Sequence, residues 1–152
     1  RPDTGNHILI GSEDPECDER IFVDPNNWDE NFTDQWQTQV LRQAQRYPDL
    51  PISNNVKGVV SLYDVTDDWI PIYDKSDLPG FYMAIGTSGN QFKNAPVAGV
   101  LMSELIEYCE NGNNHDKEPL KINLKYIHKD INLKFYSRNR QINEESSMSV
   151  LG

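Results

Sequence analysis

The sequence has few cysteines, few histidines and no long apolar run. Its 152 residues include two cysteines, Cys17 and Cys109, and three histidines. Two cysteines do not make a disulfide framework, which favours a cytoplasmic location. No apolar stretch reaches the ~18 residues of a membrane span. The histidines also lack metal-ligand spacing relative to either cysteine, so no metal site is expected.

Positive charge is scarce as well. The formal net charge is −10. Residues 1–80 carry 16 acidic and 6 basic side chains, whereas residues 81–152 carry 8 of each. A net-acidic chain without a basic stripe argues against nucleic acid or an anionic membrane as the main partner. We therefore expect the acidic surplus to form a solvated surface.

Several catalytic and phosphate-binding motifs are missing. The sequence contains no G-x-x-x-x-G-K-[ST] loop, no G-x-G-x-x-G fingerprint and no G-x-S-x-G nucleophile elbow. These absences argue against a nucleoside triphosphatase, a self-contained dinucleotide-binding domain and a serine hydrolase. The length is nevertheless sufficient for one domain with an ordinary hydrophobic core.

Two segments have the apolar spacing of helices. Residues 33–47 form an amphipathic pattern that Thr33 is placed to cap. Residues 96–108 form the second pattern, with Pro96 in its first turn and Asn94 as its cap. The apolar faces of both segments predict packing against a core rather than a ligand site.

The remaining segments indicate strands and connections. Extended runs are predicted at residues 7–11, 56–66, 69–73 and 81–86, and in two alternating stretches between residues 121 and 136. The run at 81–86 is continuously apolar, which is typical of a buried strand. We expect residues 113–120 to be a polar linker with His115 at the surface, Arg138 and Arg140 to lie on a solvated basic face, and residues 141–152 to be mobile.

The segment from residue 81 to residue 108 reads as strand, glycine-containing turn and helix. The first N–H groups of a helix lack intrahelical partners and lie at the positive end of its dipole. Glycines let a ligand approach the backbone closely. This pattern favours an electron-rich ligand at the turn, and an ordinary strand-to-helix connection is the alternative.

This turn carries a family resemblance. The run G-T-S-G-N-Q-F-K-N-A-P at residues 86–96 resembles the G-x-S-G-H-G-F-K-x-A-P signature of FAD-dependent oxidoreductases of the D-amino-acid oxidase type. That family includes the sarcosine and glycine oxidases. Residues 1–11 and 60–74 resemble two further stretches of the family, in the same order. Residues 137–140, S-R-N-R, resemble its closing basic segment.

The resemblance implies an α+β fold and three regions. Residues 1–80 would belong to a substrate-binding domain with a mixed, largely antiparallel sheet. Residues 81–112 would return to the FAD-binding domain and complete it, and residues 113–152 would form a C-terminal extension. The family's dinucleotide motif is missing, and the chain starts at Arg1 rather than Met. We therefore expect a C-terminal portion that binds little FAD alone and whose exposed sheet edges favour self-association.

The resemblance also assigns site residues. Lys93 matches a lysine near the flavin and the substrate carboxylate, and it is the candidate catalytic residue. Tyr63 matches a tyrosine that lines the substrate pocket. The candidate cofactor-binding residues are Gly86, Thr87, Ser88, Gly89, Asn90, Gln91, Phe92 and Lys93. Asn90 and Gln91 replace the usual His-Gly, and Ser61 stands where some relatives carry a flavin-tethering cysteine. A solvated lysine and a strand-packing tyrosine are the simpler interpretations of Lys93 and Tyr63.

The implied activity is oxidation of a small amine or amino acid by hydride transfer to flavin. Two alternatives remain open from the sequence. One is a non-catalytic α+β binding domain. The other is a subunit that completes a flavin site together with a separate FAD-binding chain.

Overall fold

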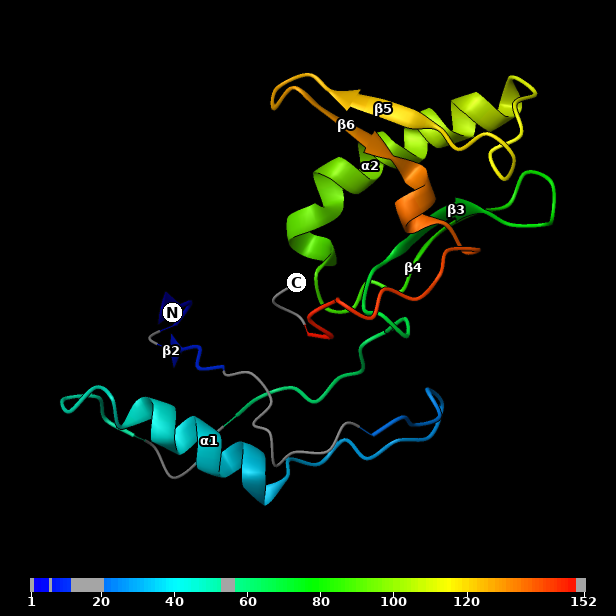
Figure 1. The fold of residues 1–152 in the computed structure, drawn as a ribbon. Helices are drawn as coiled ribbons and strands as arrows, with labels where there is room; N and C mark the ends of the chain where they lie inside the picture. The colour runs from blue at the N-terminus through cyan, green and yellow to red at the C-terminus, as the bar shows by residue number, and fades with distance from the viewer. Residues whose placement is uncertain (1, 6, 12–20, 53–56, 150–152) are drawn as a thin grey trace. The chain divides into compact units, whose positions relative to one another are not determined.

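The computed structural model describes residues 2–5, 7–11, 21–52 and 57–149, so Cys17 lies outside the described residues. The chain divides into two compact units, Arg1–Leu62 and Tyr63–Gly152, and each is described by itself. The fold is α+β, as predicted (Figure 1). Its described strands pair antiparallel in two-stranded sheets. The assignment of residues 1–80 to a substrate-binding domain stays a prediction.

The first unit contains a short hairpin and one helix. Strand β1 (Pro2–Asp3) pairs with β2 (His7–Ile8). Helix α1 (Asp34–Ala44) begins after Thr33, whose Oγ1 accepts a hydrogen bond from the Trp36 amide at 3.1 Å. This contact confirms the predicted cap. The helix ends three residues before the predicted boundary at residue 47.

The predicted strand at residues 56–66 is wrong over the part that the structure describes. Residues 57–66 form no strand, and residue 56 lies outside the described residues. Gly58 packs against the Trp36 ring so closely that a Cβ atom would lie 2.8 Å from Trp36 Cζ2. Farther along, the backbone carbonyl of Asp64 accepts from the Ser88 amide in a turn. These contacts replace the ladder that a strand requires.

The second unit begins with a hairpin. Strand β3 (Ile72–Lys75) pairs antiparallel with β4 (Tyr82–Ile85), and Ile72 lies opposite Ile85. The predicted strand at residues 81–86 therefore exists, but the prediction that it is buried is wrong. Ile85 is 47% exposed, because β4 has only one neighbouring strand among the described residues.

Helix α2 (Gln91–Glu110) is the longest described element and follows β4 after the turn at residues 86–90 (Figure 1). It begins five residues earlier than predicted, so Asn94 lies inside the helix and is not its cap. Pro96 lies beyond the first turn, where its missing N–H removes the bond to the Phe92 carbonyl. Favourable packing offsets this loss, since Ala98, Leu101 and Leu105 on the following turns are buried.

The C-terminal segment folds as a hairpin and a short helix. Strand β5 (Lys121–Leu124) pairs with β6 (Lys129–Asn132), which confirms strands in both alternating stretches. The second stretch ends earlier than its pattern suggests. Asn132 Oδ1 accepts from the Lys134 amide and starts the 3-10 helix η1 (Leu133–Tyr136). Side-chain capping by Asn132 therefore converts the alternating pattern into a turn of helix.

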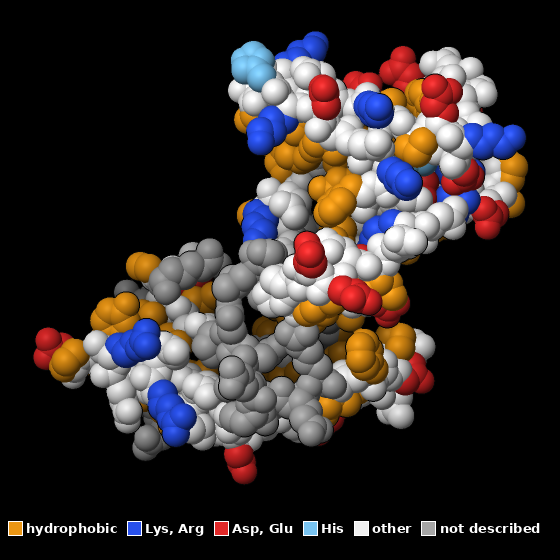
Figure 2. All heavy atoms as spheres, viewed as in Figure 1, with side chains coloured by type: hydrophobic (Ala, Val, Ile, Leu, Met, Phe, Trp, Pro, Cys, Tyr) orange, Lys and Arg blue, Asp and Glu red, His pale blue; other side chains and the backbone are white. Residues whose placement is uncertain are grey.

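The core of the second unit joins all of these elements. It contains Tyr73, Ala98, Leu101, Leu105, Ile122 and Leu133. Many hydrophobic side chains remain at the surface, as Figure 2 shows. Phe92 on α2 and Tyr126 between β5 and β6 are almost completely exposed. Neither α1 nor α2 has the length and apolar composition needed to cross a bilayer, and the described residues contain no other candidate.

Candidate functional site

The turn between β4 and α2 has an unusual backbone. Gly86, Ser88 and Gly89 all have positive φ values, of 65°, 48° and 77°. Ser88 pays a conformational cost for this left-handed geometry, because its Cβ crowds the backbone. Its side chain is completely buried, and its Oγ donates to the Gly86 carbonyl at 3.2 Å. The turn therefore requires contacts from elsewhere to hold it.

Asp64 supplies these contacts. Its Oδ2 accepts from the Thr87 amide at 3.0 Å, and its Oδ1 accepts from Thr87 Oγ1. Its backbone carbonyl accepts from the Ser88 amide at 2.9 Å. Burial opposes ionisation, but the hydrogen bonds from Thr87 prevail and lower the pKa of Asp64 below its ordinary value. The carboxylate is therefore charged at neutral pH.

The start of α2 lacks a side-chain cap. Asn90 is the N-cap residue, but its carboxamide makes no capping hydrogen bond. Its amide donates to the Thr87 carbonyl at 2.9 Å, so the backbone alone turns into the helix. The N–H groups at the helix start thus have no side-chain acceptor from the N-cap. Such donors, at the positive end of the dipole, favour an electron-rich group.

The two residues assigned to catalysis and substrate binding lie at the surface. Lys93 is exposed in the first turn of α2. Tyr63 is 62% exposed and directly precedes Asp64. The hydrogen bonds of Asp64 therefore bring the segment that carries Tyr63 against the turn that precedes Lys93.

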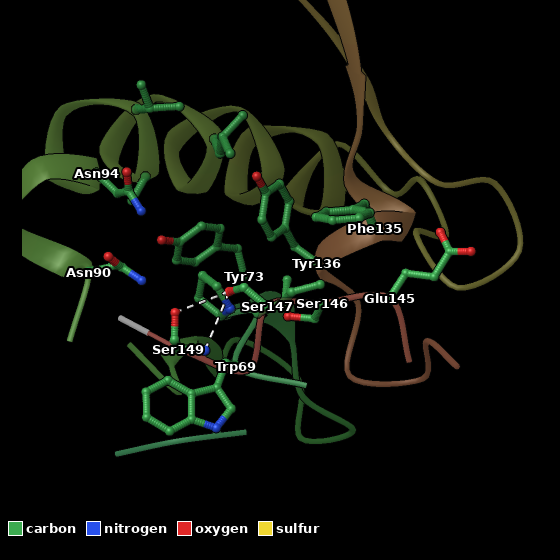
Figure 3. Close-up of a pocket in the computed structure, with 15 residues that line it drawn as sticks. Trp69, Tyr73, Asn90, Asn94, Phe135, Tyr136, Glu145, Ser146, Ser147 and Ser149 are labelled. Atoms are coloured by element: carbon green, nitrogen blue, oxygen red, sulfur yellow. Dashed lines mark hydrogen bonds between the residues drawn. The ribbon is translucent and has the colours of Figure 1, made fainter. Parts of the chain in front are cut away.

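The described residues of this unit enclose at least two cavities. The first has a volume of about 550 Å³ and lies beside α2 (Figure 3). Asn90, the N-cap of α2, and Asn94 within the helix line it together with the aromatic rings of Trp69, Tyr73 and Tyr136. The Tyr73 hydroxyl donates to Gln91 Oε1 at 3.2 Å. Of the candidate cofactor-binding residues, Asn90 is the one that lines this cavity.

The second cavity has a volume of about 620 Å³. Asp64, Thr66 and Gly86 line it on the side of the turn, and Arg138 and Arg140 line it from the C-terminal segment. A Cβ atom at Gly86 would collide with the Thr66 methyl group, so only glycine fits this position. The turn thus presents its two ends, Gly86 and Asn90, to different cavities.

Arg140 binds a buried carboxylate, which overturns the prediction of a solvated basic face. Asp68 is 1% exposed. Arg140 donates to it through Nε at 3.0 Å and Nη2 at 2.6 Å. The Ile70 amide donates to Asp68 at 3.1 Å, and the Asn143 amide at 3.2 Å. The bonds from Arg140, against the opposing effect of burial, hold the pKa of Asp68 well below its usual range.

Arg138 makes a second cluster around Asp74, which is completely buried. Asp74 Oδ2 accepts from the Arg138 amide at 2.8 Å, Arg138 Nη1 at 3.1 Å and Ser137 Oγ at 3.0 Å. Arg138 also donates to Asp116 at 2.9 Å, and Lys75 Nζ lies 2.6 Å from the same carboxylate. Hydrogen bonds from Arg138 and then Lys75 lower the pKa of Asp116 to about 2.

His115 is buried rather than on the surface, which overturns a second prediction. Its Nδ1 accepts from the Leu120 amide at 3.2 Å. Its Nε2 lies 3.8 Å from Asp74 Oδ1, which is beyond hydrogen-bonding distance. Burial lowers the pKa of His115, outweighing the opposing effect of the Asp74 charge. The neutral ring therefore belongs to the packed interior, and residues 113–120 are not a loose linker.

Sequence reasoning missed Asp64, Asp68 and Asp74 as organising residues. Asp68 and its neighbour Asp67 lie in a turn before β3. The available signal was an arginine pair in S-R-N-R with a surplus of acids upstream. Arginine combines with carboxylates in bidentate pairs, but sequence alone does not say which carboxylate is buried.

Comparison with known families identifies the class of this chain. The model of the DAO family, FAD-dependent oxidoreductases, matches residues 1–105, which is more than half of the chain. The chain therefore belongs to this family of FAD-dependent oxidoreductases. No curated protein and no solved structure matches it. The family match ends inside α2, so β5, β6, η1 and both arginines lie beyond it.

Removing Arg140 tests the buried pair. We expect Arg140→Met to lower the free energy of unfolding by about 3 kcal/mol, because Asp68 would remain buried without its counter-charge. Adding Asp68→Asn should recover part of this loss, since the amide carries no charge. Lys134→Met, at an exposed position of η1, is the control. Urea unfolding of these three variants and the parent gives the stability differences, and equal losses in Arg140→Met and the double variant would contradict the expected coupling.

Acid should weaken the cluster around Arg138. Asp116 has a pKa of about 2 in the folded chain and an ordinary value of 3.8. Because the folded value is the lower one, its stabilising contribution is present above about pH 4 and is lost as the pH falls toward about 2. Stability should therefore decline less steeply over this window in Asp116→Asn than in the parent. Urea unfolding at several pH values measures the two slopes, and identical slopes would refute the assignment.

Proposed function

We propose that the chain is the C-terminal part of an FAD-dependent enzyme that oxidises the C–N bond of a small amine or amino acid. The observation that carries this proposal is the start of α2, which lacks a side-chain cap and directly follows a turn with two glycines in left-handed geometry. Family membership supplies the cofactor class. The bulk of FAD binding is assigned to a part of the enzyme that carries the dinucleotide motif.

The residues at this turn fit one edge of a flavin. The amides of Thr87 and Ser88 already bind Asp64. We therefore assign to the cofactor the N–H groups of Gly89, Gln91, Phe92 and Lys93, because the Asn90 amide donates to the Thr87 carbonyl. Gly89 has no side chain to obstruct an approaching ring, and the N-terminal dipole of α2 stabilises negative charge there. We limit this fit to an edge, because the sequence lacks the G-x-G-x-x-G motif that binds the dinucleotide.

Lys93 and Tyr63 have separate roles in the proposal. Lys93 would place a positive charge near the N-terminus of α2, where it stabilises charge on the reduced cofactor or pairs with a substrate carboxylate. Tyr63 would contact the substrate and orient it. Bound FAD would accept a hydride from the carbon next to nitrogen. The nitrogen would lose its proton to solvent, and water would hydrolyse the resulting C=N bond. The protein side chains bind, orient and balance charge.

The visible absorption spectrum of the full-length enzyme, which includes the part that carries the dinucleotide motif, tests this function when the enzyme is purified without added cofactor. We expect the bands of oxidised flavin, and we expect small N-methyl amino acids or glycine to bleach them. A protein that is colourless and ignores added FAD would contradict the proposal and favour a non-catalytic binding domain. Co-purification of a separate flavin-bearing chain, with bleaching only in its presence, would identify the complementing-subunit alternative.

Removing the charge of Lys93 tests its assigned role. We expect Lys93→Gln to slow substrate-dependent flavin reduction by about 100-fold, as loss of one charge-stabilising donor does elsewhere. Lys134→Gln, at an exposed position of η1, should leave the rate unchanged. Stopped-flow absorbance under anaerobic conditions gives both rates. Equal rates in the two variants would show that Lys93 is a solvated surface lysine without a role in flavin reduction.

A further inference from the structure

Three hydrogen bonds connect two segments that have different roles in the proposed function. Asp64 follows Tyr63, the candidate substrate residue. Its carboxylate binds the amide and hydroxyl of Thr87, and its carbonyl binds the amide of Ser88. Thr87 and Ser88 belong to the turn assigned to the cofactor. The two segments are separated by more than 20 residues of sequence, so these bonds are tertiary and not part of a local turn.

We propose that Asp64 is a positioning residue that fixes the substrate-side segment at Tyr63 against the cofactor-side turn at Gly86–Gly89. This inference rests on the proposed function. Asp64 occupies the inward donors of the turn, at Thr87 and Ser88, and leaves the donors at the start of α2 for the ligand. Asp64 thereby determines which N–H groups of the turn remain available to a ligand.

The strained backbone explains why a carboxylate is needed at this place. Ser88 adopts a φ of 48°, which a non-glycine residue rarely adopts without support. The Asp64 carboxylate accepts two hydrogen bonds from Thr87, and the Asp64 backbone carbonyl accepts one from the Ser88 amide. These bonds compensate for the cost of the Ser88 backbone, because hydrogen bonds to a charged acceptor are stronger than neutral ones. The Thr66 methyl group reinforces the contact by packing against Gly86, where a Cβ atom does not fit.

The segment that carries Asp64 is itself held from the other side. Thr66 Oγ1 donates to Asp68 Oδ1 at 3.1 Å and lies 2.8 Å from the Ile70 carbonyl. Asp68 is bound by Arg140. Tyr63 is therefore the exposed end of a segment whose following residues are fixed at Asp64, Thr66 and Asp68. A side chain that orients a substrate needs a backbone that does not move, because small displacements of the reacting groups lower the reaction rate.

Thr87→Val and Thr87→Ser form the sharpest pair of variants. Valine removes one hydroxyl donor to Asp64 and preserves the shape of the side chain, whereas serine retains the donor. Asp64→Ala removes the whole carboxylate. Asp67→Asn is the control, because Asp67 is an exposed acid in the same segment. All variants are made in the protein used for the flavin spectrum, and thermal unfolding verifies that each is folded.

Two readouts test the proposal. Amide hydrogen exchange at Ser88 should accelerate about tenfold or more in Asp64→Ala and Thr87→Val, and remain at the parental rate in Thr87→Ser and Asp67→Asn. In turnover, kcat should fall about 10- to 100-fold in Asp64→Ala with a smaller change in KM and in flavin affinity, because orientation rather than binding is lost. Thr87→Ser should restore most of the rate that Thr87→Val loses.

The outcomes separate this inference from the function on which it rests. If the parent contains flavin and turns over, but all variants exchange and react like the parent, the positioning role is refuted and the proposed function stands. If turnover falls only in proportion to thermal stability, the role of Asp64 is structural and the inference also fails. If no variant and no parent binds flavin, the proposed function and the positioning role fall together.

Discussion

The second unit depends on two buried carboxylates that are neutralised by arginines from the C-terminal segment. Asp68 and Asp74 are almost completely inaccessible, and each would be costly to bury alone. Arg140 and Arg138 provide the counter-charges, and backbone amides occupy further lone pairs. Since each pair joins residues more than 60 positions apart, the pairs also fix the topology. These two ion pairs, rather than a continuous sheet, connect the segment after η1 to β3 and to the loop that precedes β3.

This arrangement places the candidate site within a frame that extends beyond the family match. The match ends at residue 105, inside α2, whereas the arginines follow η1. Thr66 contacts Asp68 on one side and Gly86 on the other. A continuous series of contacts therefore leads from Arg140, through Asp68 and Thr66, to the first residue of the turn. The C-terminal extension is thus part of the support for the turn, and the basic S-R-N-R segment has a structural role that its resemblance did not specify.

Local physics was enough to predict some elements from the sequence. The Thr33 cap and the helix after the glycine turn were recoverable, because each depends on nearby residues. The antiparallel strands were expected only from the family resemblance. The run at residues 57–66 was not. Its β-branched residues favour a strand, but β structure requires a partner, and Asp64 binds a turn instead. His115 was also misplaced, because its burial depends on Asp74 and Leu120, which the local sequence of a polar loop does not reveal.

The candidate site also has one part that the sequence predicts and one part that it does not. The position of the turn was predictable because glycines, a preceding apolar strand and a following helix occur together in sequence. The partner of the turn was not, because pairing of Asp64 with Thr87 brings together residues from two different segments. Of the 16 acidic residues in the first 80, composition gives no reason to choose Asp64 over Asp67, and both are exposed. What distinguishes Asp64 is geometric: it meets a backbone in left-handed conformation whose inward N–H groups would otherwise be unpaired. The role that we propose for Asp64 therefore follows from the turn that it faces and not from the acidic surplus of the sequence.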